Sequence, residues 1–236
     1  MRIHLISTPR NVSTALMYSF AQRADTRVVD EPFYAYYLAR SDADHPDREA
    51  VLASQPTDPE GVFADLDRLD DRPLLFLKGM AHHLGGVDLL RLAEWKSLFF
   101  IRDPKQLIAS YAQVIERPTM QDIGSRRMVE LFDAIRAAGG EAYVLDSADL
   151  VNDPERTLMA VCDRLAIPFD AAMLGWEAGP RPEDGVWAPH WYANVHRSTG
   201  FSPQATSTRP LPTHCEELYR EALPLYRTLS AHAIRA

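Results

Sequence analysis

Two short segments of the chain carry side chains suited to holding phosphate groups. The first, STPRNVST from Ser7 to Thr14, is a polar loop that places Arg10 among hydroxyl and amide side chains, directly before a helical pattern. Backbone N–H groups at a helix start attract anions, and an arginine adds a permanent positive charge. The second, FIRDPKQLIASY, places Arg102 eight residues before Ser110. Together the two segments are suited to a nucleotide that is phosphorylated at both ends.

The elements that must position these segments are strands followed by helices. Residues 2–7 and 97–101 are short apolar runs typical of buried parallel strands, and helical patterns follow them over 13–23 and 104–116. Ligands of open α/β sheets collect beyond the carboxyl ends of the strands. We therefore expect both segments to face one crevice.

The rest of the chain continues this alternation of strands and helices. Further strands are expected over 27–30, 74–78 and 141–145, and further helices over 86–95, 121–138, 154–165 and 213–232. Such alternation predicts an α/β fold of three layers, α/β/α, with a central and mainly parallel sheet. A length of 236 residues with 46% hydrophobic residues is enough to bury a full core, so one domain is expected over 1–236.

Three segments resemble motifs of the sulfotransferases that use 3′-phosphoadenosine 5′-phosphosulfate (PAPS). STPRNVSTALMYSF is similar to the family's 5′-phosphosulfate loop, and FIRDPKQLIASY is similar to its 3′-phosphate motif. YVLDSADLVNDPERTLMAVCDRLAIPFD resembles the family's pattern of a strand, Asp-Pro-Glu and a helix closed by a Leu-x-Ile-Pro turn. The resemblance covers most of residues 1–170. It implies a P-loop-type nucleotide-binding fold and a PAPS-dependent enzyme that transfers a sulfuryl group to a hydroxyl or amine of a small acceptor, without a metal.

The resemblance also assigns donor contacts. Val12 stands where the family often has Gly, and Ser147 stands where many members have a Tyr near the adenine. The late-chain run from Arg197 to Gly200 combines a cation, two hydroxyls and a flexible backbone, which suits closure over the 3′-phosphate. The expected donor-binding residues are Arg10, Asn11, Val12, Ser13, Thr14, Arg102, Ser110, Arg197, Ser198, Thr199 and Gly200.

Sulfuryl transfer needs charge stabilisation on the leaving group and a base for the acceptor's proton. Arg10 is the candidate for the leaving-group side. Lys78, at the end of the strand 74–78, could contact the bridging oxygen or the acceptor, or it could simply pair with acids. The base is either Glu31, directly after the strand 27–30, or His82 with its neighbour His83. Glu31 is favoured because its spacing departs less from the family pattern.

Two segments outside the motifs are candidate walls of an acceptor pocket. The connection 41–72 holds ten Asp or Glu against three Arg and is interpreted as a solvated surface connection rather than as such a wall. The region 177–212 is rich in proline and aromatic residues and predicts a long loop or lid. Its aromatic and histidine side chains could line the acceptor pocket, stack on the adenine or anchor packing; they are Trp187, His190, Trp191 and Tyr192.

Composition limits the possible partners. The net charge of −8 comes mostly from the connection 41–72, and the near-neutral remainder argues against a nucleic-acid partner. No apolar stretch approaches the roughly 20 residues of a membrane span, and the first residues are too polar for a secretory signal. With two cysteines the chain is expected in the reducing cytoplasm. The acceptor's identity and the oligomeric state are not encoded in any motif.

Two other functions stay open at this stage. A P-loop kinase-like phosphotransferase would share the strand, loop and helix, but the sequence GxxxxGK[ST] is absent. A non-catalytic nucleotide-binding or interaction protein could use the same scaffold, because a fold alone does not decide function. Preference for PAPS over ATP and measurable transfer would distinguish the three.

Overall fold

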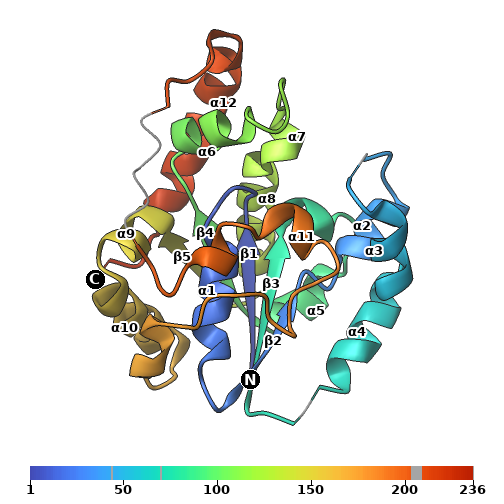
Figure 1. Cartoon of the computed structure of the whole chain (residues 1–236), viewed down its shortest axis with the longest axis vertical. Helices are drawn as coiled ribbons and strands as arrows, with labels where there is room; N and C mark the ends of the chain where they lie inside the picture. The colour runs from blue at the N-terminus through green and yellow to red at the C-terminus, as the bar shows by residue number, and fades with distance from the viewer. Residues whose placement is uncertain (44, 70, 203–208, 236) are drawn as a thin grey trace.

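A parallel sheet of five strands forms the centre of the protein in the computed structural model, which describes residues 1–43, 45–69, 71–202 and 209–235 (Figure 1). Neighbouring strands follow the order β2-β3-β1-β4-β5, and every pairing is parallel. The strands are β1 (Arg2–Ser7), β2 (Thr26–Asp30), β3 (Leu74–Met80), β4 (Lys96–Ile101) and β5 (Ala142–Asp146). The predicted parallel α/β sheet is thus confirmed, with each strand close to its expected range.

The strands are apolar because both faces of the sheet are covered. In β1, Ile3 and Leu5 pack into the core on one face, whereas Ile6 packs into the core on the other. All three side chains are fully buried. A strand of this kind shows a continuous apolar run instead of alternation, which is the pattern that the sequence displays.

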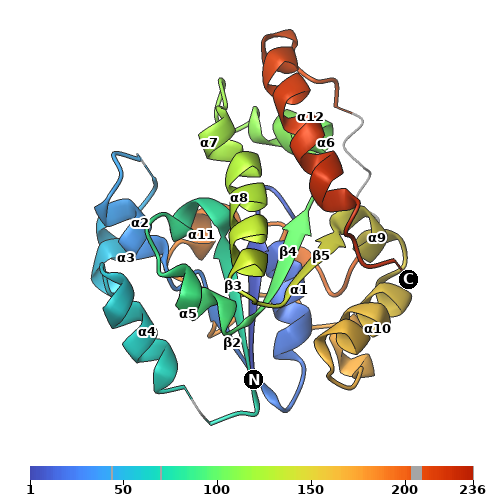
Figure 2. The ribbon, with the colours of Figure 1, turned by 180° about the vertical axis from the view of Figure 1, so that it is seen from behind.

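Helices cover both faces of the sheet (Figures 1 and 2). On the face that Figure 1 shows, α1 (Ser13–Ala21), α9 (Ser147–Asn152) and α10 (Pro154–Leu165) supply the apolar side chains. The opposite face, seen in Figure 2, is covered by α4 (Pro59–Asp67), α5 (Leu89–Ala93), α8 (Ser125–Ala137) and α12 (Glu216–Ser230). The three-layer arrangement agrees with the prediction.

Local signals explain where several helices begin and end. Helix α6 (Pro104–Tyr111) is capped by Asp103, whose carboxylate accepts hydrogen bonds from two backbone N–H groups, and it ends before the expected residue 116. The expected helix 121–138 is divided at Gly124, whose φ of 67° ends α7 (Met120–Ile123) before α8 begins. The expected helix 86–95 is reduced to α5.

The two long segments predicted outside the motifs contain short helices. The connection 41–72 forms α3 (Arg48–Ser54) and α4, although its residues 44 and 70 lie outside the described residues. The region 177–212 forms α11 (Ala188–Trp191) and the 3-10 turn η3 (Val195–Arg197), and its residues 203–208 also lie outside them. The remaining elements are α2 (Tyr34–Ala39), η1 (Ala81–Leu84), η2 (Ala171–Leu174) and η4 (Thr213–Cys215).

The carboxyl ends of the strands meet at one edge of the sheet. The chain runs from β1 to β2 and β3 on one side of β1, and the connection from β3 to β4 then crosses to the other side, so the strand order reverses at β1. This switch point is where open parallel sheets bind ligands. Within the described residues, no helix combines the length and the apolarity that crossing a membrane requires.

Candidate active site

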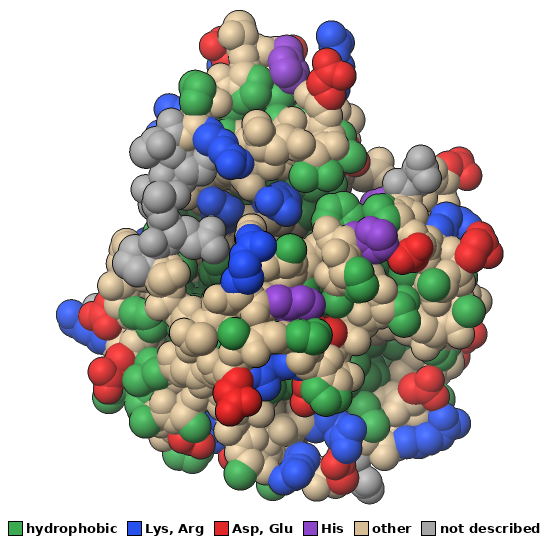
Figure 3. Space-filling view, viewed as in Figure 1, with side chains coloured by type: hydrophobic (Ala, Val, Ile, Leu, Met, Phe, Trp, Pro, Cys, Tyr) green, Lys and Arg blue, Asp and Glu red, His purple; other side chains and the backbone are tan. Residues whose placement is uncertain are grey.

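A cavity of about 720 Å³ lies at this edge of the sheet. Its lining combines the loops that follow β1, β2, β3 and β4 with parts of the late region 177–212. Figure 3 shows a group of Lys and Arg side chains near the middle of this face, with His side chains beside them. The lining includes every candidate catalytic residue and nine of the candidate donor-binding residues: Arg10, Asn11, Val12, Ser13, Thr14, Glu31, Lys78, His82, Arg102, Ser110, Ser198 and Gly200.

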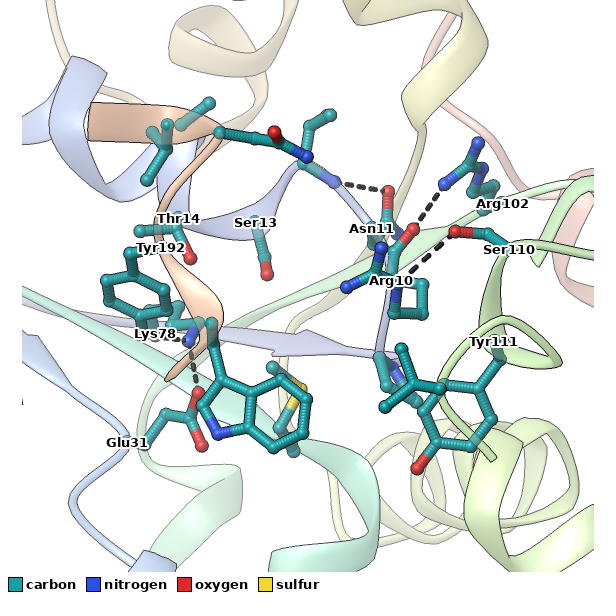
Figure 4. Close-up of a pocket in the computed structure, with 18 of the residues that line it drawn as sticks. Arg10, Asn11, Ser13, Thr14, Glu31, Lys78, Arg102, Ser110, Tyr111 and Tyr192 are labelled. Carbon is teal, nitrogen blue, oxygen red and sulfur yellow. Dashed lines mark hydrogen bonds and ion pairs between the residues drawn. The ribbon is translucent and has the colours of Figure 1, made fainter. Parts of the chain in front are cut away.

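One end of the cavity is built by the two predicted phosphate-binding segments. The Nε of Arg10 donates a hydrogen bond to Ser110 Oγ at 3.2 Å, although 100 residues separate them in the chain. The Arg102 guanidinium donates to the backbone carbonyl of Arg10 (Figure 4). Side chains from both segments therefore share one crevice.

Three arginines give this end of the cavity its charge. Burial, together with the nearby guanidinium of Arg10, lowers the pKa of Arg102. Burial also lowers the pKa of Arg10, and Arg209 contributes in the same direction. Like charges held close in a half-buried site favour an anion between them. Arg209 also lines the cavity, and sequence reasoning missed it because it stands in no motif.

Asn11 fixes the position of the loop between β1 and α1. The Nδ2 of Asn11 donates to the carbonyl of Phe100 at 2.9 Å, and its Oδ1 accepts from the Val12 N–H at 3.0 Å. Asn11 thus ties the loop to the end of β4. Val12 provides no side-chain cap for α1, so the first backbone N–H groups of this helix, at Ser13 and Thr14, can serve an anion.

A buried charge cluster lies at the opposite end of the cavity (Figure 4). The Lys78 side chain is fully buried, and its Nζ lies 3.1 Å from Asp30 Oδ1 and also contacts Glu31 Oε1. The same ammonium donates to the Tyr192 hydroxyl at 2.8 Å. That hydroxyl donates to Asp30 Oδ2 at 2.7 Å and accepts from Trp187 Nε1 at 3.0 Å. Lys78 thus pairs with acids, one of the two roles that the sequence left open; it also lines the cavity, and its contact with a bridging oxygen or an acceptor stays a prediction.

Burial and mutual contact set the protonation of this cluster. Burial alone favours the neutral amine of Lys78, but Asp30 and Glu31 outweigh it and raise the lysine pKa. Burial raises the pKa of Glu31, and the Asp30 carboxylate adds to this shift against the effect of Lys78. A carboxylate with a raised pKa is a better proton acceptor near neutral pH. The cluster therefore holds a lysine cation shared by two carboxylates, one of which suits a base.

Two candidate site residues have a left-handed backbone. Arg10 has a φ of 56° and Glu31 a φ of 40°, values that are strained for side chains other than glycine. The Glu31 N–H donates to the Lys78 carbonyl at 2.7 Å, which holds this conformation in place. Such strain turns the chain abruptly where it leaves β2 and aims the carboxylate at the cavity.

The adjacent side chains of His82 and His83 contact different groups. His83 is 2% exposed, is stacked on the rings of Tyr34 and Tyr37 with centroids 4.7 and 4.8 Å away, and places Nδ1 3.6 Å from Glu31 Oε2. His82 meets the Tyr37 ring edge-on at 5.1 Å, and burial lowers its pKa to about 4. Both line the cavity. The geometry thus brings His83, named in the sequence only as a neighbour, next to Glu31.

The late region contributes only some of its predicted residues. Trp187, Trp191 and Tyr192 line the cavity, whereas His190 instead contacts Asp47 Oδ2 at 2.6 Å through its Nε2. From the acidic connection, His45 and Pro46 line the cavity, so part of that segment is a wall after all.

Arg197 and Thr199 lie apart from the cavity lining. Arg197 is exposed, and its guanidinium donates to Asn194 Oδ1 at 2.7 Å. The Thr199 carbonyl accepts from the Trp176 N–H at 3.0 Å. Their predicted contact with a 3′-phosphate stays a prediction.

Comparison with known proteins identifies the family. A family model described as a sulfotransferase domain matches residues 1–233. The chain belongs to this sulfotransferase family. Two Arabidopsis thaliana proteins, named branched-chain-amino-acid aminotransferase-like proteins 1 and 2, are 40% and 38% identical to this sulfotransferase domain over 98% of its length. The domain spans only 42% and 41% of those two proteins.

Solved structures show the same fold. The sulfotransferase from Alicyclobacillus acidocaldarius superposes with a TM-score of 0.60 at 14% identity, covering 99% of this chain and 96% of that one. The sulfotransferase domain from the Synechococcus PCC 7002 olefin synthase gives a TM-score of 0.56 at 18% identity, covering 94% of each chain. The fold and the family predicted from the motifs are therefore confirmed, and the family supports sulfuryl transfer in general.

Proposed function

We propose that this domain transfers a sulfuryl group from PAPS to a hydroxyl or amine of a small acceptor. The observation that carries the proposal is the meeting of Arg10, Arg102 and Ser110 at one end of a cavity whose other end holds Glu31 and Lys78. Cations and helix-start N–H groups suit the phosphates of the donor, and the buried cluster suits the reacting groups.

In this proposal the two donor segments bind the two phosphate groups, and the buried cluster holds the reacting groups. Arg102 and Ser110 bind the 3′-phosphate, while Arg10 and the start of α1 hold the 5′-phosphosulfate. A base removes the acceptor's proton, and the acceptor oxygen or nitrogen forms a bond to sulfur as the bond from sulfur to the phosphate oxygen breaks. The products are the sulfated acceptor and adenosine 3′,5′-bisphosphate. Arg10 stabilises the charge that develops on the leaving oxygen.

The base is Glu31 in this proposal, with His82 as the alternative. Glu31 lines the cavity, its pKa is raised by burial, and its Oε1 is held by Lys78 while Oε2 faces His83 at 3.6 Å. His82 also lines the cavity, but burial keeps its pKa near 4, which weakens it as a proton acceptor at neutral pH. The geometry therefore favours the carboxylate.

Thermal shift with matched nucleotides tests the donor. Adenosine 3′,5′-bisphosphate should stabilise the protein far more than AMP or ATP, because only the bisphosphate places a group against Arg102 and Ser110. Arg102→Ala should abolish this preference, whereas Arg156→Ala, which removes an exposed arginine of α10, should keep it. If Arg102→Ala retains the preference, the 3′-phosphate assignment is wrong.

Label transfer from ³⁵S-labelled PAPS to a mixture of small alcohols and amines tests the reaction itself. Binding of the bisphosphate without any transfer would favour the non-catalytic alternative, and equal stabilisation by ATP would favour a kinase-like phosphotransferase.

A further inference from the structure

We propose that the acceptor of this domain is an alcohol carried on an aromatic or similarly flat ring, uncharged or positively charged, and that the site refuses anionic acceptors. The inference rests on the proposed function, because it assigns the volume beside Glu31 to the acceptor. It adds the chemical class of the molecule that enters there.

Charge is divided unequally between the two ends of the cavity. Three arginines serve the donor end. Among the described residues that line the cavity, Lys78 is the one further Lys or Arg, and it is fully buried against both Asp30 and Glu31. With Glu31 ionised, this cluster of two carboxylates and one ammonium is net negative. An acceptor that carries its own carboxylate or phosphate would find no unpaired cation here.

Two histidines at this end, His82 and His83, stay neutral near pH 7. Burial lowers the pKa of His82 to about 4 and holds the pKa of His83 well below its usual value. The Nδ1 atoms of both rings are buried and make no hydrogen bond with the described residues. A buried polar atom without a partner is unfavourable unless a ligand or water supplies one. Neutral imidazoles therefore give an anionic acceptor no positive charge to pair with.

The walls of this part of the cavity are flat and apolar. Tyr34, Trp187 and Trp191 contribute ring surfaces, and the Tyr34 ring meets the Trp187 ring with centroids 5.0 Å apart. Val114 and Ile115 also line the cavity and are 48% and 41% exposed, so they add apolar surface that a ligand can cover. Apolar surface that an acceptor buries here strengthens its binding in proportion to the area removed from water. A ring therefore gains more than a charged chain of the same size.

Three probes that share one phenol ring test the inference. Tyrosol is neutral, tyramine carries a cation, and para-hydroxyphenylacetate carries an anion at the end of a short side chain. Each is added to protein saturated with adenosine 3′,5′-bisphosphate for binding and to protein with PAPS for transfer. Tyrosol and tyramine should bind and accept sulfate, whereas the acid should be weaker by about tenfold or more in both measurements.

A charge added at the rim supplies the matched comparison. Val114→Lys should strengthen binding of the acid and weaken that of tyramine, each about threefold or more, because it adds an unpaired cation to the cavity lining. Leu90→Lys makes the same change at a residue of α5 that is 69% exposed and does not line the cavity, and it should change neither. The bisphosphate should still stabilise both variants.

Two results would overturn the inference. One is that the acid binds wild-type protein as tightly as tyrosol does, and the other is that none of the three probes binds while the bisphosphate does. Failure of the bisphosphate to stabilise the wild-type protein would instead remove the proposed function, so the two failures are distinguishable.

Discussion

The hydroxyl of Tyr192 donates a hydrogen bond to Asp30 Oδ2 at 2.7 Å across 162 residues of sequence. The same oxygen accepts hydrogen bonds from Lys78 and Trp187. One hydroxyl thus uses its donor and both acceptor positions inside the protein. This contact ties the late region 177–212 to the carboxyl ends of β2 and β3, and it closes one wall of the cavity.

Removing this hydroxyl should destabilise the protein. Tyr192→Phe leaves the buried Asp30 carboxylate with one partner fewer, which costs about 1–3 kcal/mol. Denaturant unfolding measures the loss. Tyr143→Phe removes a hydroxyl whose partner, Glu141, is exposed, and it should cost less than about 0.5 kcal/mol. Equal effects of the two substitutions would mean that the buried network contributes nothing of its own.

Removing the Lys78 ammonium should destabilise the folded protein. Lys78→Met leaves the carboxylates of Asp30 and Glu31 buried without their cation, at a cost of about 3–5 kcal/mol at neutral pH. Without Lys78, burial raises the pKa of Glu31 further, so the folded variant binds a proton that the unfolded chain releases above pH of about 4. The variant should therefore regain stability as the pH falls from 7 toward 5. A loss of stability that is the same at both pH values would contradict the shared ion pair.

His82 should make the protein less stable in mild acid. Its folded pKa is about 4, whereas an unfolded histidine titrates near 6.5, so the unfolded state binds the extra proton between these values. The contribution is fully present above about pH 6.5 and is lost as the pH falls to about 4. In His82→Gln the free energy of unfolding should depend less steeply on pH in this window, by the slope that corresponds to about one bound proton. Parallel curves for variant and wild type would show that His82 is not buried in the neutral form.

Arg209 should contribute to donor binding, and Arg197 serves as the comparison. Arg209 lines the cavity near Arg10, whereas Arg197 lies outside the lining. Arg209→Ala should weaken adenosine 3′,5′-bisphosphate binding by about tenfold, as expected for a charge-assisted contact. Arg197→Ala should change it by less than about twofold in the same calorimetric titration. A larger loss of affinity in Arg197→Ala than in Arg209→Ala would instead support the donor contact that the sequence predicts for Arg197.

Glu31 should control the rate of transfer without controlling donor affinity. Glu31→Gln should lower kcat by about 10²–10⁴-fold, the usual contribution of a general base. Bisphosphate binding should change little, because the donor end lies across the cavity. His82→Asn should have a smaller effect on kcat. A larger loss in His82→Asn than in Glu31→Gln would transfer the role of base to the histidine.

Sequence reasoning found the parts of this protein that depend on local signals. The strands show as apolar runs because both sheet faces are covered, and the two donor segments show because loops before helices carry recognisable side chains. Some helix boundaries were predicted wrongly because their local signals are weak. Gly124 divides one expected helix, and the short helix α9 went unnoticed because six residues carry little periodicity.

The sequence by itself determined the parallel α/β fold, the family and the two segments that meet at Arg10 and Ser110, because each depends on neighbours along the chain. Only the tertiary structure decided that Asp30 and Tyr192 share Lys78, that His83 reaches Glu31 and that Arg209 lines the cavity. Those contacts join residues far apart in sequence, and their energies come from burial, which depends on how the whole chain packs.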